Sequence, residues 1–163
     1  AHQAINLHAL NEPEKGTSVN VGVIGGGTRS NVVAAEARAE IDVRVMTLAE
    51  WERIEQAVMS LKPVTPDTTI EYTGGLNRPP MERTPPLVTL FVRARALAER
   101  IGYTLHETGT GGGSDGNFTA ALGIPTLDGL GAVGNGAHSP DEHIIVDMLP
   151  RRAALLADLL RVL

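Results

Sequence analysis

A regular alternation of side chains over residues 35–45 constrains the fold of this chain more than any other feature. Apolar side chains occupy every second position and charged ones lie between them: Ala35, Ala37, Ala39, Ile41, Val43 and Val45 against Glu36, Arg38, Glu40, Asp42 and Arg44. Successive side chains of a strand point to opposite faces. The pattern therefore predicts a half-buried antiparallel strand with one polar face.

The segments around this strand predict the rest of a small layer. Residues 1–10 have the pattern of the end of a helix, and Pro13 and Gly16 break it. Alternating valines indicate a strand around residues 19–23, and helical spacing from Trp51 to Leu61 indicates a helix that ends at Pro63. Residues 68–73 have the composition of a third strand. This order is that of a ferredoxin-like layer that lacks its first strand.

The prolines between residues 78 and 86 mark the predicted domain boundary, which gives domains 1–78 and 79–163. The second domain starts with a strongly amphipathic helix over residues 87–101. Strands are predicted over 103–107 and 124–127, with a short helix between them that starts at Ser114 or Asp115 and ends at Gly123. A last helix covers 148–163. This alternation predicts α/β structure, so the whole chain combines α+β and α/β. Because two strands are too few for a doubly wound sheet, we expect the missing strands upstream of Ala1.

Composition excludes several classes of protein. The chain has 163 residues, a net charge of −5 and no cysteine, so no disulfide framework or thiolate site exists. No cluster of Lys and Arg indicates nucleic acid or an anionic membrane as partner. No apolar run has transmembrane length, and the given residues are not expected to contain a signal peptide. We expect a cytoplasmic protein whose natural N-terminus is missing, with the periplasm or secretion as alternatives.

His138 is the candidate metal ligand. It lies in the glycine-rich segment 131–142, where open backbone lets a ring nitrogen approach an ion. A zinc site needs three or four ligands, and the sequence has no H-E-x-x-H motif and no adjacent pair of glutamates. Neighbouring Glu142 and His143 rarely converge on one ion, so Glu142 is interpreted as structural or as supporting a ligand. A structural or simply exposed histidine is the alternative.

The segment from Thr110 to Asp115 leads from a predicted strand to a predicted helix. Backbone N–H groups at such a junction hold an oxyanion or a carboxylate, and a tight turn is the equally weighted alternative. Residues 111–116 and 129–134 both fit G-x-G-x-x-G, which is a weak indication of nucleotide binding. No P-loop motif occurs.

Arg44 and Asn31 are the remaining polar candidates. Arg44 either forms a surface ion pair with Asp42 or grips a carboxylate with two parallel hydrogen bonds. If the chain between Asn31 and Arg44 is extended, the two lie roughly 40 Å apart at about 3.3 Å per residue. One small ligand could not contact both from a single chain.

Together these segments resemble a known family. Residues 19–26, Asn31-Val32-Val33-Ala34 and Asp42-Val43-Arg44 look like the lid of the di-zinc metallohydrolases that include glutamate carboxypeptidase, acetylornithine deacetylase and the aminoacylases. Residues 110–115 and 134–139 look like the C-terminal metal segment of that family. Within that family, the segments resemble those of the glutamate carboxypeptidase subgroup. Ala34 stands where the family usually has proline.

The resemblance implies a function for each candidate. His138 ligates one of two zinc ions, with cobalt or manganese as alternative metals. Arg44 binds the substrate carboxylate, Asn31 binds substrate or the transition-state oxygen in the partner's site, and Gly111, Gly112 and Gly113 line the substrate pocket. By the same resemblance, residues 1–78 correspond to a partial lid and dimerisation domain. Residues 79–163 correspond to the C-terminal portion of the catalytic domain.

The family's other metal ligands and its catalytic base would lie upstream of Ala1, so no catalytic residue is expected in this chain and the fragment alone should be inactive. The expected function is part of a zinc-dependent homodimeric hydrolase that cleaves amide bonds next to a carboxylate in N-acyl amino acids or peptides. A non-catalytic binding or dimerisation module and a nucleotide-binding α/β domain are the alternatives.

Overall fold

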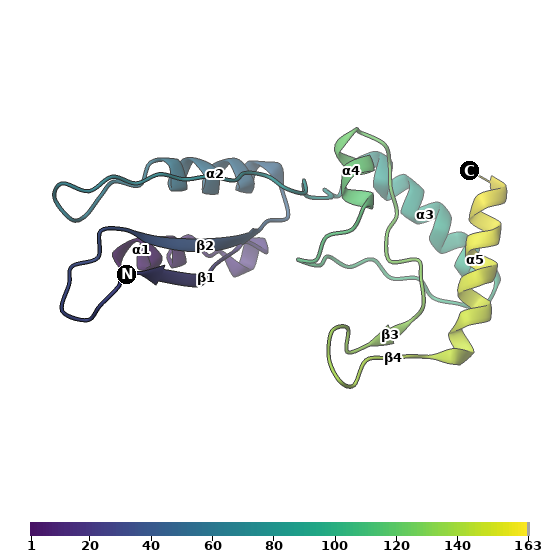
Figure 1. Cartoon of the computed structure of the whole chain (residues 1–163). Coiled ribbons are helices and arrows are strands. Elements are labelled where there is room, and N and C mark those ends of the chain that lie inside the picture. The colour runs from purple at the N-terminus through teal and green to yellow at the C-terminus, as the bar shows by residue number, and fades with distance from the viewer. Residues whose placement is uncertain (163) are drawn as a thin grey trace. The chain divides into compact units, whose positions relative to one another are not determined.

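The structure, a computed structural model, describes residues 1–162 as two compact units (Figure 1). The first contains Ala1–Glu82 and Thr110–Gly113. The second contains Arg83–Gly109 and the chain from Ser114 onward. Each unit has its own apolar cluster.

The first unit is built on an antiparallel hairpin. Strand β1 (Ser18–Gly26) pairs with β2 (Ala37–Arg44), from Ser18 opposite Arg44 to Gly26 opposite Ala37, with a bulge between Val21 and Val23. The other elements are α1 (His2–His8), η1 (Pro13–Lys15) and α2 (Leu48–Met59). The Thr47 hydroxyl caps α2 by accepting from the Glu50 amide. The predictions of both strands and of both helices are confirmed.

The core of this unit is small. It consists of Leu7, Val19 and Ile54, each at most 3 % exposed, so α1, β1 and α2 contribute one residue each. On β2 only Val43 packs partly against this cluster, while Ala37, Ala39 and Ile41 are exposed. The prediction of a half-buried apolar face therefore holds at one end of the strand and fails at the other.

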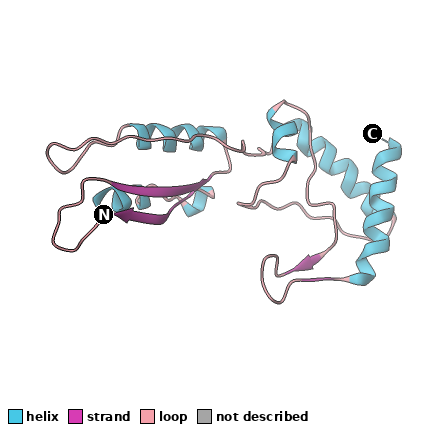
Figure 2. Cartoon of the chain, in the orientation of Figure 1, coloured by secondary structure: helices cyan, strands magenta, loops and turns pink. Residues whose placement is uncertain are grey.

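The third predicted strand, residues 68–73, is wrong. The segment after α2 is a loop (Figure 2), and the sheet of this unit contains β1 and β2. Tyr72 is 54 % exposed, and Ile70 is half-buried. Strand-forming side chains do not make a strand unless a neighbouring backbone pairs with them. The ferredoxin-like layer is therefore not confirmed.

The second unit is formed mainly by two packed helices, α3 (Pro85–Arg100) and α5 (Leu149–Val162). Between them lies a cluster of buried residues: Phe91, Ala94, Leu97, Ala98, Leu105, Leu155 and Leu159. Thr84 caps α3, and two prolines occupy its first turn, where their missing N–H groups cost nothing. Both helices were predicted; Leu163, the last residue of the second prediction, lies outside the described residues.

The strands predicted over 103–107 and 124–127 are wrong as well. Both segments are loops, although Leu105 is buried in the helical cluster. Parallel strands are stable only within a sheet covered on both faces, and the residues described here offer neither segment a partner strand. The unit instead has a short antiparallel pair, β3 (Gly134–Asn135) with β4 (His143–Ile144), followed by η2 (Val146–Met148). Helices with small antiparallel sheets give the chain α+β character.

The short helix α4 (Gly116–Ala121) was predicted, and Gly123 follows its end in the left-handed conformation that glycine adopts most easily. Asp115 stands at the cap position, but its side chain makes no capping bond there. None of the helices within residues 1–162 is long and apolar enough to span a bilayer.

Candidate functional site

His138 lies in the turn that joins β3 to β4. Its side chain is exposed, and its backbone has a φ of 65°, a left-handed value that is uncommon outside glycine. Three hydrogen bonds fix the surrounding turn: Ser139 N–H to the Gly136 carbonyl at 2.9 Å, Glu142 N–H to the Ser139 carbonyl at 3.1 Å, and Ile145 N–H to the Val133 carbonyl at 2.8 Å. The hairpin therefore presents the imidazole to solvent from an ordered backbone.

The neighbours of His138 do not complete a metal centre. Within residues 1–162 no three His, Asp or Glu side chains gather closely enough to hold an ion. The His143 ring nitrogen Nδ1 contacts the Asp141 carbonyl at 2.9 Å, and Glu142 is exposed. The described residues thus offer one candidate imidazole, whereas a zinc site needs at least three protein ligands. They do not hold a metal by themselves, and no reaction step can be assigned to a metal here.

The glycine loop, Gly111–Gly113, lies against the stem of Arg44 in the first unit. A Cβ added to Gly111 would stand 3.4 Å from the Arg44 Cδ, and one added to Gly113 would stand 2.7 Å from the Arg78 Cδ. The backbone of this loop therefore approaches two arginine side chains. The structure brings together Arg44 and the glycines, which the sequence suggested separately. Arg78 was not among the predicted site residues.

Arg44 forms the ion pair with Asp42 that its position on the polar face suggested. Its Nε lies 2.9 Å from the Asp42 carboxylate, and both side chains are more than half exposed. The hydrogen bond from Arg44 Nε to Asp42 raises the pKa of the guanidinium. Surface pairs of this kind contribute little to stability. The bond uses Nε–H, and a guanidinium carries four further N–H donors.

Asn31 lies in the loop between the two strands of the hairpin, at the end opposite Arg44. Arg44 pairs with Ser18 at one end of the ladder, and the loop begins beyond Gly26 and Ala37 at the other. Asn31 is exposed. The structure does not bring these two predicted residues together within one chain.

The junction before α4 is a tight turn rather than an open anion cradle. The Ser114 N–H donates to the Asn117 side-chain oxygen at 2.8 Å, and the Gly116 N–H donates to the Ser114 hydroxyl at 3.2 Å. The Gly112 N–H donates to the Thr110 hydroxyl at 3.2 Å. Three backbone donors that could have faced a ligand are thus already bound, and no strand precedes the turn.

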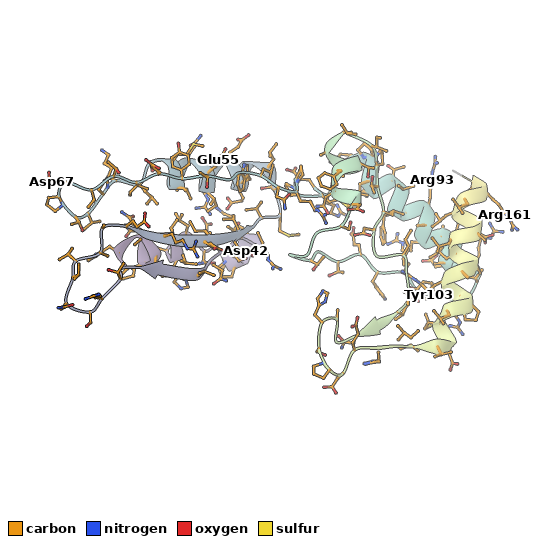
Figure 3. All side chains as sticks on the ribbon, in the orientation of Figure 1. Asp42, Glu55, Asp67, Arg93, Tyr103 and Arg161 are labelled. Carbon is orange, nitrogen blue, oxygen red and sulfur yellow. The ribbon has the colours of Figure 1, made fainter. Side chains whose placement is uncertain are left out.

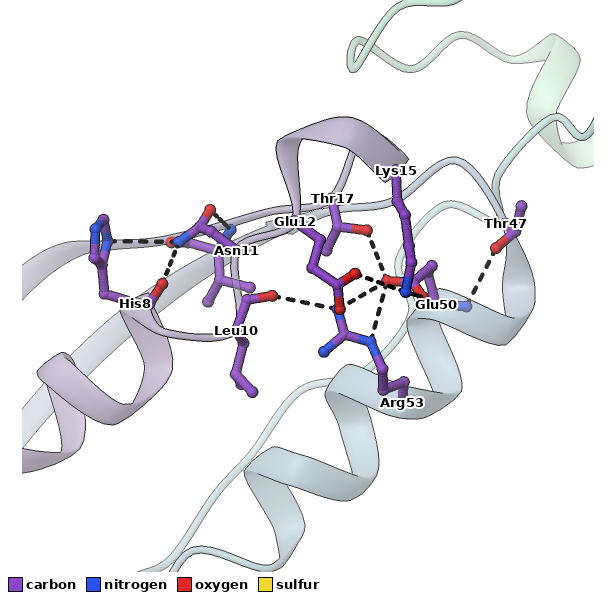
Figure 4. Close-up of polar contacts among 10 residues, drawn as sticks. His8, Leu10, Asn11, Glu12, Lys15, Thr17, Thr47, Glu50 and Arg53 are labelled. Carbon is purple, nitrogen blue, oxygen red and sulfur yellow. Dashed lines mark hydrogen bonds and ion pairs between the residues drawn. The ribbon is translucent and has the colours of Figure 1, made fainter.

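A polar network that the sequence did not indicate joins α2 to residues 10–17 in the first unit (Figure 4). The Glu50 carboxylate accepts from the buried Thr17 hydroxyl at 2.9 Å and from Arg53 Nη2 at 2.8 Å. Arg53 also donates to the Leu10 carbonyl at 3.2 Å and pairs with Glu12 at 3.1 Å. These bonds join α2 to the segment before β1.

The same contacts shift the titration of Glu50. Hydrogen bonding from Arg53 is the main cause that lowers the pKa of Glu50 from 4.5 to about 2, helped by Thr17 and Lys15, while partial burial opposes the shift. The group has a structural role, because the bonds among Thr17, Glu50, Arg53 and Glu12 link α2 to the segment before β1.

Comparison with known proteins settles the family. A model of the peptidase family M20/M25/M40 matches residues 2–162. This chain belongs to that family. The resemblance stated from the glycine-rich and lid-like segments is therefore confirmed.

Individual relatives in this family are hydrolases by name. The chain is 28 % identical to carboxypeptidase G2 of Pseudomonas sp. (strain RS-16) over 157 residues, which is 93 % of the chain and 37 % of that protein. It is 31 % identical to succinyl-diaminopimelate desuccinylases of Stenotrophomonas maltophilia (strain R551-3) and Dechloromonas aromatica (strain RCB), covering 82 % and 89 % of the chain and 35 % and 38 % of those proteins. The chain thus spans little more than a third of the length of these relatives.

Proposed function

We propose that this M20-family chain is part of a zinc-dependent hydrolase that cleaves an amide bond next to a carboxylate in peptides or N-acyl amino acids. The observation that carries the proposal is the family match over residues 2–162. Two relatives are named carboxypeptidase G2 and succinyl-diaminopimelate desuccinylase, and both names support hydrolysis of an amide bond in a carboxylate-bearing substrate.

In this proposal residues 1–78 belong to a lid and dimerisation domain, and residues 79–163 belong to the catalytic domain. His138 supplies one imidazole to a two-zinc centre whose other ligands and catalytic base come from outside this chain. The exposed ring on an ordered hairpin supports that role, because a ligand has to be held in place and still be reachable.

Arg44 binds the substrate carboxylate in this proposal. The guanidinium is exposed, and among residues 1–162 the carboxylate that competes for it is the surface group of Asp42. A substrate carboxylate can replace such a partner at small cost, because an exposed pair is worth less than about 1 kcal/mol. The adjacent glycine loop has no side chains that would block a ligand near the arginine stem.

The test is His138→Asn in the full-length protein. Asparagine tolerates the left-handed backbone of this position and removes the imidazole, so the hairpin should survive. We expect zinc content to fall from about two ions per chain toward one, and hydrolysis of an N-acyl glutamate to drop by about a hundredfold or more.

His143→Ala is the matched control, since its ring contacts the Asp141 carbonyl within the same hairpin. It should retain both metals and most of the activity. Full zinc content together with undiminished turnover in His138→Asn would show that His138 is not a ligand. The isolated residues 1–163 should not hydrolyse the same substrate.

A further inference from the structure

Arg152 is a buried arginine in the helix that follows the His138 hairpin. It lies in the first turns of α5 and shares the buried face of that helix with Leu155 and Leu159. The residue is only 6 % exposed. Burying a cation is costly unless hydrogen bonds compensate for its lost hydration. The hydrogen-bond partners of Arg152 therefore have to explain its burial.

The partners of Arg152 are backbone carbonyls of the segment that leads to His138. Its Nε donates to the Gly131 carbonyl at 2.7 Å, and its Nη2 donates to the Gly129 carbonyl. Its Nη1 donates to the Tyr103 hydroxyl at 2.9 Å, and the guanidinium lies 5.9 Å from the Tyr103 ring centre. Tyr103 lies next to α5 (Figure 3). Across residues 1–162 Arg152 has no carboxylate partner.

These bonds attach both ends of the hairpin to α5. The chain runs from Gly131 through β3 to His138, returns through β4 and η2, and enters α5 at Leu149. Ile145 ties the two arms of the hairpin by donating to the Val133 carbonyl. Arg152 then joins the start of the incoming arm to the helix that continues the outgoing arm. Both ends of the hairpin are therefore fixed to one helix.

We propose that Arg152 is a positioning residue that fixes the hairpin carrying His138. The inference rests on the proposed function, in which His138 binds zinc. A metal ligand has to be held within about 0.5 Å of its productive place by the residues behind it. The two-residue β3 and β4 strands alone cannot provide that rigidity, because they contribute only one short stretch of ladder.

The shape of the guanidinium explains why arginine occupies this position. Its planar fork donates to two carbonyls two residues apart and to a hydroxyl at the same time. A lysine ammonium is a point charge on a flexible stem and cannot bridge the same three acceptors with fixed geometry. The substitution Arg152→Lys therefore keeps the charge and removes the alignment.

The experiment uses three variants of the full-length protein: Arg152→Lys, Arg152→Met and Tyr103→Phe. The first readout is hydrogen exchange of backbone amides in the metal-free protein, which is independent of zinc and of activity. We expect the Ile145 and Glu142 amides to exchange at least about tenfold faster in both Arg152 variants, while amides inside α3 change less than about twofold. Tyr103→Phe, which keeps both carbonyl bonds, should resemble the wild type in the hairpin.

The second readout is zinc affinity. Both Arg152 variants should bind the zinc that depends on His138 about ten- to a hundredfold more weakly, which is the usual effect of removing a residue that orients a ligand. Thermal unfolding of the apo-protein shows whether each variant is folded. If Arg152→Met does not fold, the test of the positioning role rests on Arg152→Lys.

The results separate the two proposals. Unchanged zinc content in His138→Asn would reject His138 as a ligand, while hydrogen exchange would still decide whether Arg152 holds the hairpin. Equal acceleration of hairpin and α3 amides would overturn the inference and make Arg152 a general core residue. Unchanged hairpin exchange in Arg152→Lys would overturn it too.

Discussion

Asn31 and Arg44 provide the sharpest test of how the sites of the proposed enzyme are assembled. Both are candidate substrate contacts, and they lie at opposite ends of the β1–β2 hairpin. The eight residues of β2 alone cover about 23 Å at about 3.3 Å per step, and Asn31 lies beyond that strand in the loop. A substrate of two residues spans only about 7 Å.

One chain therefore cannot apply both residues to one substrate while the hairpin stays straight. A two-fold symmetric dimer removes the conflict if each site takes Arg44 from its own chain and Asn31 from the other. Symmetry then predicts a definite result for mixed dimers. A dimer of one Asn31→Ala chain and one Arg44→Ala chain has one site with both defects and one site with neither.

The assay is the rate of hydrolysis of an N-acyl glutamate by the full-length protein after subunits have exchanged. Each variant alone should be nearly inactive. Each mixed dimer should recover about half of the wild-type activity, and an equal mixture should recover about a quarter, because half of its dimers are mixed. Arg38→Ala, which removes another exposed arginine from β2, should remain active.

A second mixture serves as the control for complementation. Asn31→Ala chains mixed with chains that carry both substitutions should recover nothing, because no chain then supplies Asn31. Subunit exchange is verified by mass spectrometry of the intact dimer. If exchange is complete and the first mixture still shows no activity, the two residues act within the same chain or one of them has no role in the site.

Two further predictions concern the two units separately. Folding lowers the pKa of Glu50 from 4.5 to about 2, so the contribution of its carboxylate to stability is complete above pH 4.5 and is lost as the pH falls toward 2. The difference in the free energy of unfolding in urea between wild type and Glu50→Gln should therefore shrink over that pH range, with exposed Glu52→Gln as the charge control. A difference that does not change with pH would contradict the role of the Glu50 network. Gly134→Ala should open the hairpin and weaken zinc binding, because a Cβ at residue 134 collides with the His143 carbonyl. Gly131→Ala should leave zinc binding unchanged, because a Cβ at residue 131 has open space around it. Equal zinc affinity in the two variants would refute this prediction.

The helices of this chain could be predicted because their signals are local. Helical hydrogen bonds connect residues four apart, so the apolar spacing of α3 and the capping Thr84 carry the information within one segment. Strands β1 and β2 could be predicted for a similar reason, since the side chains of each alternate cleanly within one segment. Both elements lie close to their expected bounds.

The segments 68–73, 103–107 and 124–127 show the opposite case. Each has strand-forming side chains, but a strand needs a partner backbone, and the composition of a segment says nothing about where that partner is. Leu105 is buried against helices, so burial alone produced the strand-like pattern there. The β3–β4 pair escaped prediction because two residues are too short to alternate.

The contacts that position the candidate site join parts of the chain that no local pattern connects. Arg152 and Tyr103 are 49 residues apart, and Gly111 lies close to Arg44 although both α2 and α3 lie between them in the sequence. Yet one signal was available. Arg152 occupies the same helical face as Leu155 and Leu159, and an arginine on an apolar face must either reach water or find buried acceptors. In the structure the carbonyls of Gly129 and Gly131 are those acceptors. The helical pattern therefore indicated that Arg152 needs partners, and the structure identifies them as the backbone that leads to His138.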